Sequence, residues 1–331
     1  MVLFWVTVLA LAVLLYVLLD GFDLGVGIFF GFMREESLRR SAMVAVAPVW
    51  DGNETWLVVA GVVLWGAFPL TYSILFSALY LPVLFMSAGL ILRGVAFEFR
   101  DKAQRSRWLW TVAFFAGSVL GAFMQGAMVG ALVEGIAVAH GEYVGNALGW
   151  LTPFAVLCGL GLCLGYALIG ACWLLGKSQG ELRAVARQWI PGLALASVGM
   201  LAVLFLYALL NHLYILHRWL ERPYLFVFPV IATLAAGILA VSVRGAQQRD
   251  GTPFAMVAIL FAAAFGTFLV SFWPYMIPFS VTIDQAAGPH SSLAFMFWGE
   301  GLFILPLMFA YTFVSYRVFR GKLPSSAGTQ Y

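Results

Sequence analysis

Four carboxyl groups stand in stretches of the chain that are otherwise mostly apolar. Asp20 and Asp23 lie within residues 3–32, and Asp51 and Glu54 lie within residues 43–68. A carboxylate at membrane depth costs at least about 2.5–3.5 kcal/mol, so it needs a partner, water or a neutralising proton. The two acids of each stretch are three residues apart and would share one face of a helix. Acids placed in this way point to proton transfer.

The depth of these acids supports the same chemistry. At a rise of about 1.5 Å per residue, Asp23 would lie roughly 16 Å from the inner end of its helix and Asp51 roughly 14 Å deep. Burial and mutual repulsion would both favour the protonated carboxyl, so the groups could exchange protons near neutral pH. We therefore predict a proton path from the cytoplasm. The structural alternative is that Asp20 or Asp51 caps a helix interruption at the adjacent glycine.

A cation stands near the inner end of the third apolar stretch. Arg93 is about four residues inside that stretch and is followed by Glu98. Its side chain could reach out to the interface, or it could pair with Glu98 or with an acid of the second stretch. We predict that Arg93 forms a structural ion pair, with Glu98 as the nearest acid in the sequence.

Residues that could hold a metal or a haem are poorly placed. A haem within a bilayer needs an axial His or Met from the middle of a helix. His140, His212, His217 and His290 all fall at the outer ends of the apolar stretches or in outer loops. The three cysteines share one apolar stretch and lack metal-ligand spacing. We predict that this chain binds no haem and no metal, and that it carries no catalytic residue of its own.

The composition decides what kind of element must position these groups. Of the 331 residues, 63% are apolar and 10% are charged, whereas a soluble domain carries about 25% charge. This excludes a water-soluble protein, and the high hydropathy excludes a disordered one. We therefore expect the chain to lie in a lipid bilayer. The net charge of +3 gives no support to a nucleic-acid partner, because charge in a membrane protein is informative by position.

The fold class predicted is an all-α, multi-pass membrane protein with nine transmembrane helices in bundles. Crossing about 30 Å of hydrocarbon takes about 20 apolar residues, and a helix satisfies its own backbone hydrogen bonds. We expect a single transmembrane domain over residues 1–322 and a short polar tail over 323–331. The first stretch has no basic segment before it, so we expect it to be retained. The predicted spans are residues 3–32, 43–68, 72–97, 109–139, 151–175, 189–210, 224–243, 254–273 and 292–314.

The basic residues predict which way these helices run. Fifteen of the 18 lysines and arginines fall in the first, third, fifth and seventh loops and in the C-terminal tail. Only Arg218 and Arg222 fall in the other loops. Because short cytoplasmic loops collect Lys and Arg, we predict that the N-terminus lies outside and the C-terminus in the cytoplasm.

The acidic segments also resemble a known family. Residues 47–57 read Ala-Pro-Val-Trp-Asp-Gly-Asn-Glu-Thr-Trp-Leu, after Asp-Gly-Phe-Asp-Leu-Gly at 20–25 and before Arg-Gly-Val-Ala-Phe-Glu-Phe-Arg at 93–100. Together they closely resemble subunit II of the cytochrome bd-type quinol oxidases. The resemblance is strong over residues 1–105, and the glutamate at position 54 and the short loops resemble the cyanide-insensitive branch.

The resemblance implies a partner and a reaction. Subunit II would pack against a homologous, haem-bearing subunit I in a heterodimer of the bacterial cytoplasmic (inner) membrane. Subunit I would carry two b haems and haem d, oxidise membrane quinol and reduce oxygen to water with cytoplasmic protons. Subunit II itself carries no haem, although some members hold a structural quinone in it. A small single-span subunit is a further candidate partner.

Carried over residue by residue, the resemblance assigns Asp51 to a proton conduit at the subunit interface. It also matches Asp23 and Arg93 to further polar positions of the family. The function implied is a haem-free scaffold that supplies protons to subunit I. The predicted path comprises Asp51 with its neighbours Trp50, Asn53, Glu54 and Trp56, and Asp20 with Asp23.

Two other functions remain open at this point. A secondary transporter could use interrupted, acidic first and second helices as an ion and substrate site. A purely structural subunit would tolerate neutralisation of all four acids.

Overall fold

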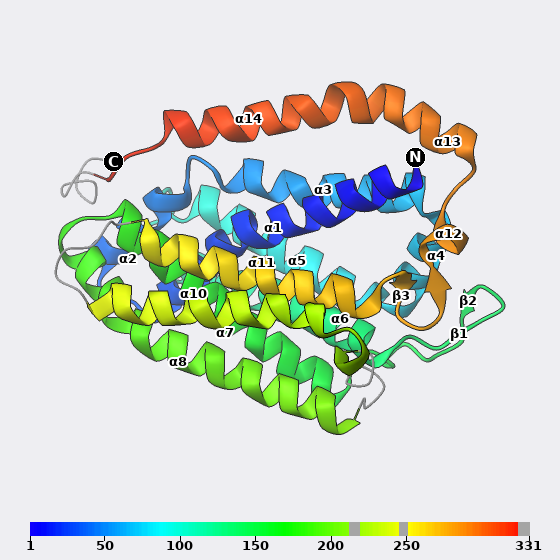
Figure 1. The fold of residues 1–331 in the computed structure, drawn as a ribbon. Helices are drawn as coiled ribbons and strands as arrows, with labels where there is room; N and C mark the ends of the chain where they lie inside the picture. Colours follow the sequence, from blue (N-terminus) through cyan, green and yellow to red (C-terminus); the bar gives the residue numbers. More distant parts are fainter. Residues whose placement is uncertain (212–218, 245–250, 324–331) are drawn as a thin grey trace.

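The structure, a computed structural model, describes residues 1–211, 219–244 and 251–323. Helices dominate it, and the strands described form two short antiparallel hairpins at one end of the molecule (Figure 1). The all-α fold class predicted from composition is thus confirmed. The hairpins are β1 (Val138–Ala139) with β2 (Glu142–Tyr143), and β3 (Tyr275–Ile277) with β4 (Val281–Thr282).

Eight helical segments of the described chain are long and apolar enough to cross a membrane. A ninth crossing results when α3 (Trp50–Ala67) and α4 (Pro69–Ala78), bent by 119°, count as one span, which agrees with the nine predicted. The eight are α1 (Val2–Gly31), α5 (Tyr80–Phe99), α6 (Arg107–Glu134), α7 (Pro153–Lys177), α8 (Gly180–Asn211), α10 (Val227–Arg244) with the short turn η1 (Pro223–Phe226), α11 (Thr252–Phe272), and the run α13 (His290–Met296), η2 (Phe297–Ile304) and α14 (Leu305–Val318).

The second predicted span is wrong at its beginning. Its first residues belong to a separate amphipathic helix, α2 (Glu36–Val46), and the chain turns through residues 47–49 before α3 begins at Trp50. Pro48 accounts for the break, because proline has no N–H to donate and its ring clashes with the preceding helical turn. Asp51 therefore lies exposed in the first turn of α3 instead of deep in a helix. The third predicted span is likewise interrupted, at Leu79 between α4 and α5.

Helix α1 lies at the centre and packs against α3, α6 and α7. Its N-terminal end lies near the two hairpins, whereas α2 and the C-terminal end of α14 lie at the opposite end (Figure 1). The second half of α1, which carries Asp20 and Asp23, is buried on every side from position 20 to position 30. The remaining short helix, α12 (Ile283–Ala286), lies near the hairpins (Figure 1).

Glycines bring the helix backbones of this core into direct contact. A Cβ atom built on Gly25 of α1 would lie 1.8 Å from the carbonyl oxygen of Tyr166 in α7. One built on Gly117 of α6 would lie 2.5 Å from the carbonyl oxygen of Gly89 in α5. Small residues at helix interfaces allow such approach in membranes. This packing brings α1 against α7, and α6 against α5.

Candidate functional site

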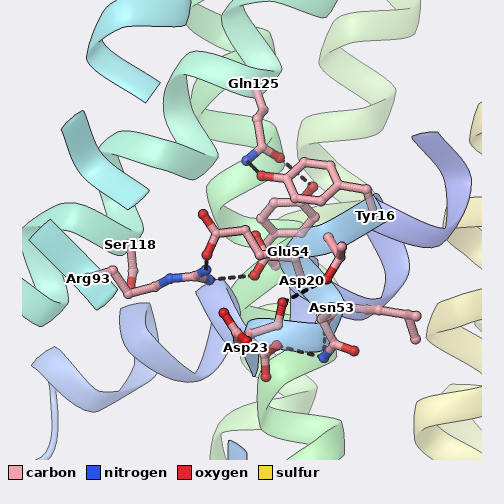
Figure 2. Close-up of polar contacts among 12 residues, drawn as sticks. Tyr16, Asp20, Asp23, Asn53, Glu54, Arg93, Ser118 and Gln125 are labelled. Atoms are coloured by element: carbon pink, nitrogen blue, oxygen red, sulfur yellow. Dashed lines mark hydrogen bonds and ion pairs between the residues drawn. The ribbon is translucent and has the colours of Figure 1, made fainter. Parts of the chain in front are cut away.

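Arg93 joins three helices through two ion pairs. Its Nη1 lies 2.6 Å from Asp20 Oδ1 on α1, and its Nη2 lies 3.0 Å from Glu54 Oε2 on α3 (Figure 2). The side chains of Arg93 and Asp20 are 2% and 0% exposed, and that of Glu54 is 29% exposed. The ring of Trp50 lies 6.0 Å from the guanidinium carbon. One buried cation therefore holds two acids of different helices side by side.

A second set of hydrogen bonds surrounds Asp23. Asn53 Nδ2 donates to Asp23 Oδ2 at 2.7 Å (Figure 2) and also lies 3.3 Å from the carbonyl oxygen of Leu19. On its other side, the Tyr316 hydroxyl donates to Asn53 Oδ1 at 3.0 Å. Asn53 therefore connects the core helix α1 with α14, the last helix of the chain.

A neutral set of hydrogen bonds lies one helical turn before Asp20 on α1. Gln125 Nε2 of α6 donates to the Tyr16 hydroxyl at 2.7 Å, and the Tyr166 hydroxyl of α7 donates to Gln125 Oε1 at 2.8 Å. All three side chains are buried. Tyr16 precedes Asp20 by four residues and so lies on the same helix face. Sequence reasoning missed these residues, although a glutamine inside an apolar stretch was an available signal.

We call Arg93 together with Asp20, Asp23 and Glu54 the central polar network. It contains more acids than bases. Asp20, Asp23 and Glu54 face one guanidinium. In addition, Asp20 Oδ2 and Asp23 Oδ1 are buried and accept no hydrogen bond from the described residues. A buried carboxylate without a compensating charge is costly, and a proton removes that cost. An added proton would therefore reduce the uncompensated negative charge of this network.

The other predicted path residues lie around this network. Asp51 is exposed, one turn before Glu54 on α3, and its side chain makes no hydrogen bond within the described residues. Trp50 stacks on Phe97 with ring centroids 5.3 Å apart. Trp56 is buried, and its indole Nε1 has no hydrogen-bond partner there. Of the four acids, the structure thus brings three together and leaves Asp51 at the edge.

Comparison with known proteins decides the family. The family model for cytochrome bd terminal oxidase subunit II matches residues 1–319. The chain belongs to this family. It is 28% identical to a probable cytochrome oxidase subunit 2 of Haemophilus influenzae, over 97% of this chain and 94% of that one. It is 26% identical to cytochrome bd ubiquinol oxidase subunit 2 of Bacillus subtilis, over 96% of each chain.

Two further similarities agree with this membership. Cytochrome bd-I ubiquinol oxidase subunit 2 of Escherichia coli is 31% identical over 62% of this chain and 55% of its own length. The bd oxidase structure from Geobacillus thermodenitrificans has a chain with the same fold, with a TM-score of 0.79 at 21% identity, covering 96% of this chain and 98% of that one. The resemblance seen in the sequence is confirmed, and family members are subunits of an oxidoreductase complex.

The structure contradicts one predicted pairing and one structural alternative for this subunit II chain. Arg93 does not pair with Glu98. The Glu98 side chain is exposed, and its Oε2 lies 3.6 Å from Lys102 Nζ. Positions five residues apart point to different sides of a helix, so Arg93 instead reaches Glu54, the alternative partner from the second stretch, together with Asp20 of the first stretch. Helix α1 is also continuous past Gly21, so Asp20 caps no interruption there. The transporter alternative thereby loses the broken first helix that it requires.

The histidines of this subunit II chain lie away from the polar network. His140 lies in the turn between β1 and β2, and His290 is the first residue of α13. His212 and His217 lie outside the described residues. Within residues 1–211, 219–244 and 251–323, no histidine is among the buried side chains, and no group of three or more His, Cys, Asp or Glu could hold a metal ion. A buried histidine that could serve as an axial haem ligand is therefore absent from the described residues.

Replacing Asn53 by alanine should lower the free energy of unfolding by about 1–3 kcal/mol, because the buried Asp23 carboxyl loses its donor. The Tyr316→Phe variant keeps that bond and loses only the outer one, so its expected cost is about 0.5–1.5 kcal/mol. Chemical unfolding of the purified complex in detergent micelles measures both. Equal costs for the two variants would contradict the central position given to Asn53.

Proposed function

We propose that this chain is the haem-free subunit of a bd-type quinol oxidase in a bacterial cytoplasmic membrane. It would scaffold the haem-bearing subunit I in a heterodimer and supply protons from the cytoplasm. Family membership supports an oxidoreductase complex with quinol as its substrate. The two b haems and the haem d of the complex, bound by subunit I, supply electron transfer and the reduction of oxygen to water. This chain contributes acids and a packing surface.

The observation that carries this proposal is a gradient of exposure along three acids. Asp51 is exposed at the start of α3, Glu54 one turn later is partly buried, and Asp20 across the helix interface is fully buried. Asp51 and Glu54 are three residues apart and therefore lie next to each other on one face of α3. Arg93 in turn holds Glu54 next to Asp20. A proton can therefore enter at Asp51, pass to Glu54 and reach the buried acids.

The last helices provide the scaffold. Phe295, Phe303, Leu307 and Phe313 along α13, η2 and α14 are each more than 60% exposed in the isolated chain. The same segment reaches the start of α3, because Tyr311 lies against Gly52 and Tyr316 bonds Asn53. A subunit I that covers this face would lie next to Asp51. The exposed end of the acid series would then open at the boundary between the two subunits.

The Asp51→Asn variant tests the proton path. It removes the exchangeable proton and keeps the shape of the side chain, so quinol-driven oxygen consumption by the purified complex should fall by an order of magnitude or more. Haem content and co-purification of the two subunits should stay normal. The matched control is Asp284→Asn, because Asp284 is also an exposed aspartate but lies on α12 at the opposite end of the bundle (Figure 1).

Two outcomes would count against the proposal. Undiminished oxygen consumption in Asp51→Asn would remove Asp51 from the path. Loss of haem or of subunit I from the same variant would instead assign Asp51 a structural role, since the exchange of a proton does not affect assembly.

A further inference from the structure

Glu300 is an acid of the membrane-spanning helices that lies outside the central polar network. It belongs to the last span, His290–Val318, and is half-buried. At a rise of about 1.5 Å per residue, it lies about 15 Å from the His290 end, near the middle of about 30 Å of hydrocarbon. Its carboxyl group makes no hydrogen bond and no ion pair with residues 1–211, 219–244 or 251–323. A carboxylate at this depth needs a partner, and the described part of this chain supplies none.

The backbone that carries Glu300 is wound differently from the rest of the span. Residues Phe297–Ile304 form the π-helix η2, at whose end the Leu305 amide donates to the carbonyl oxygen of Glu300, five residues back. Pro306 follows at once and has no amide hydrogen with which to continue the α-helical pattern. Single π-helical turns inside α-helices are rare and occur frequently at functional sites. The unpartnered acid and the wider turn therefore coincide at one point of the last span.

The residues around Glu300 show which face of the molecule it borders. Phe297 packs against α1, since its ring centre lies 5.1 Å from that of Phe4. Trp298 and Phe303, which flank Glu300 in the sequence, are 64% and 66% exposed. Glu300 therefore borders the exposed apolar face of α13, η2 and α14, the face that we propose above to be covered by subunit I.

The chemistry of a carboxyl group distinguishes between the two possible coverings of this face. Lipid tails offer neither a charge nor a hydrogen-bond donor, so a carboxylate that faces them is unfavourable. A helix of another subunit can offer both, and acids within membranes almost always face the interior of a protein and pair there with another group. A basic side chain neutralises the acid, which a neutral donor does not. Glu300 therefore favours a protein helix with a positive charge over lipid.

We propose that Glu300 pairs with an arginine or lysine that a membrane helix of subunit I presents at the same depth. This charge pair would be the polar contact of a largely apolar interface along α13, η2 and α14. Because the two charges meet at only one alignment of the facing helices, the pair would also fix the position of subunit I along this face. Such a partner requires that subunit I covers the face, so the pairing rests on the proposed function. It does not depend on the proposed proton path.

The sharpest test measures how fast subunit I leaves the immobilised, tagged chain in detergent, followed by the haem absorbance of the eluate. Glu300→Gln keeps the shape of the side chain but leaves the facing cation buried without its acid, so dissociation should be about 30-fold faster or more. Glu300→Leu should dissociate at least as fast, because leucine also offers no hydrogen bond.

The matched control is Glu221→Gln, which should dissociate at the unmodified rate. Glu221 is exposed and lies two residues before η1, which packs against α10 and α11. Helices α10 and α14 lie on opposite sides of α1 (Figure 1). The control therefore removes a glutamate charge away from the face that carries Glu300.

Crosslinking identifies the partner directly. Glu300→Cys would be combined with a cysteine in place of each arginine or lysine in the membrane helices of subunit I, one at a time. A short thiol crosslinker should join the two subunits at one of these basic positions.

Three outcomes would overturn the pairing. Dissociation of Glu300→Leu at the unmodified rate would show that the acid is neutral and faces lipid. Crosslinking at none of the basic positions would remove the cation as its partner. Loss of bound quinone from Glu300→Gln, with subunit I released at the unmodified rate, would assign the acid to a quinone instead. If the unmodified chain retains no subunit I at all, the proposed function itself is contradicted, which distinguishes the two failures.

Discussion

The Arg93→Met variant should lower the free energy of unfolding by about 3–5 kcal/mol, because it leaves a buried acid without its cation. Asp20 is fully buried and Glu54 mostly so, and both pair with this one guanidinium. Methionine fills a similar volume, so the loss would reflect charge more than packing. We expect reduced yield of the assembled complex and a lower midpoint of chemical unfolding in detergent micelles.

A compensating variant separates the charge from the side chain itself. Adding Asp20→Asn and Glu54→Gln to Arg93→Met removes all three charges, and replacing a whole buried ion pair is often close to neutral for stability. The triple variant should therefore recover most of the lost stability. Its rate of oxygen consumption should nevertheless stay low, because the triple variant lacks two acids of the proposed path. If the triple variant is as unstable as Arg93→Met alone, the ion pairs do not explain the loss.

The Gly25→Ala variant should lower the free energy of unfolding by about 3 kcal/mol, at the upper end of the usual cost of overpacking. The added methyl carbon would lie 1.8 Å from a backbone oxygen, Tyr166 O, and a backbone atom cannot rotate away as a side chain can. Helices α1 and α7 would have to separate, which would also shift Asp20 and Asp23. Thermal unfolding of the complex, with oxygen consumption as a second measurement, tests this.

The control for this substitution is Gly199→Ala. Gly199 lies exposed in α8, and nothing lies within 4 Å of an added Cβ. Alanine should there be neutral or stabilising by about 0.5–1 kcal/mol, because it is the better helix former. Similar effects of the two substitutions would contradict the direct backbone contact between α1 and α7.

Much of the fold follows from the length of the apolar stretches. Helix α7 spans Pro153–Lys177 and α11 spans Thr252–Phe272, within two residues of the predicted ends. The hydrophobic thickness of a bilayer requires such lengths, so composition alone determines them. The break before α3 is different, because apolar residues continue through it and only Pro48 marks it. Hydropathy carries no information on that local geometry.

The site was predictable in its residue types but not in its pairings. The cost of burying charge made Asp20, Asp23 and Arg93 conspicuous in an apolar chain. Which acid Arg93 meets depends on how α1, α3 and α5 are rotated against one another, and Glu98 was the nearer acid only in the sequence. Tyr16 and Gln125 escaped notice because neutral polar groups cost less to bury and are common in membrane helices.

The most direct test of the account is the rate at which the complex takes up protons from the cytoplasmic side. Complexes reconstituted in liposomes would be reduced with quinol and then exposed to oxygen, with a pH-sensitive dye in the compartment that faces α2. In Asp51→Asn, proton uptake and oxygen reduction should slow together, while the reduction of the haems by quinol keeps its rate and Asp284→Asn behaves as the unmodified complex. Proton uptake at the unmodified rate in Asp51→Asn would contradict the account.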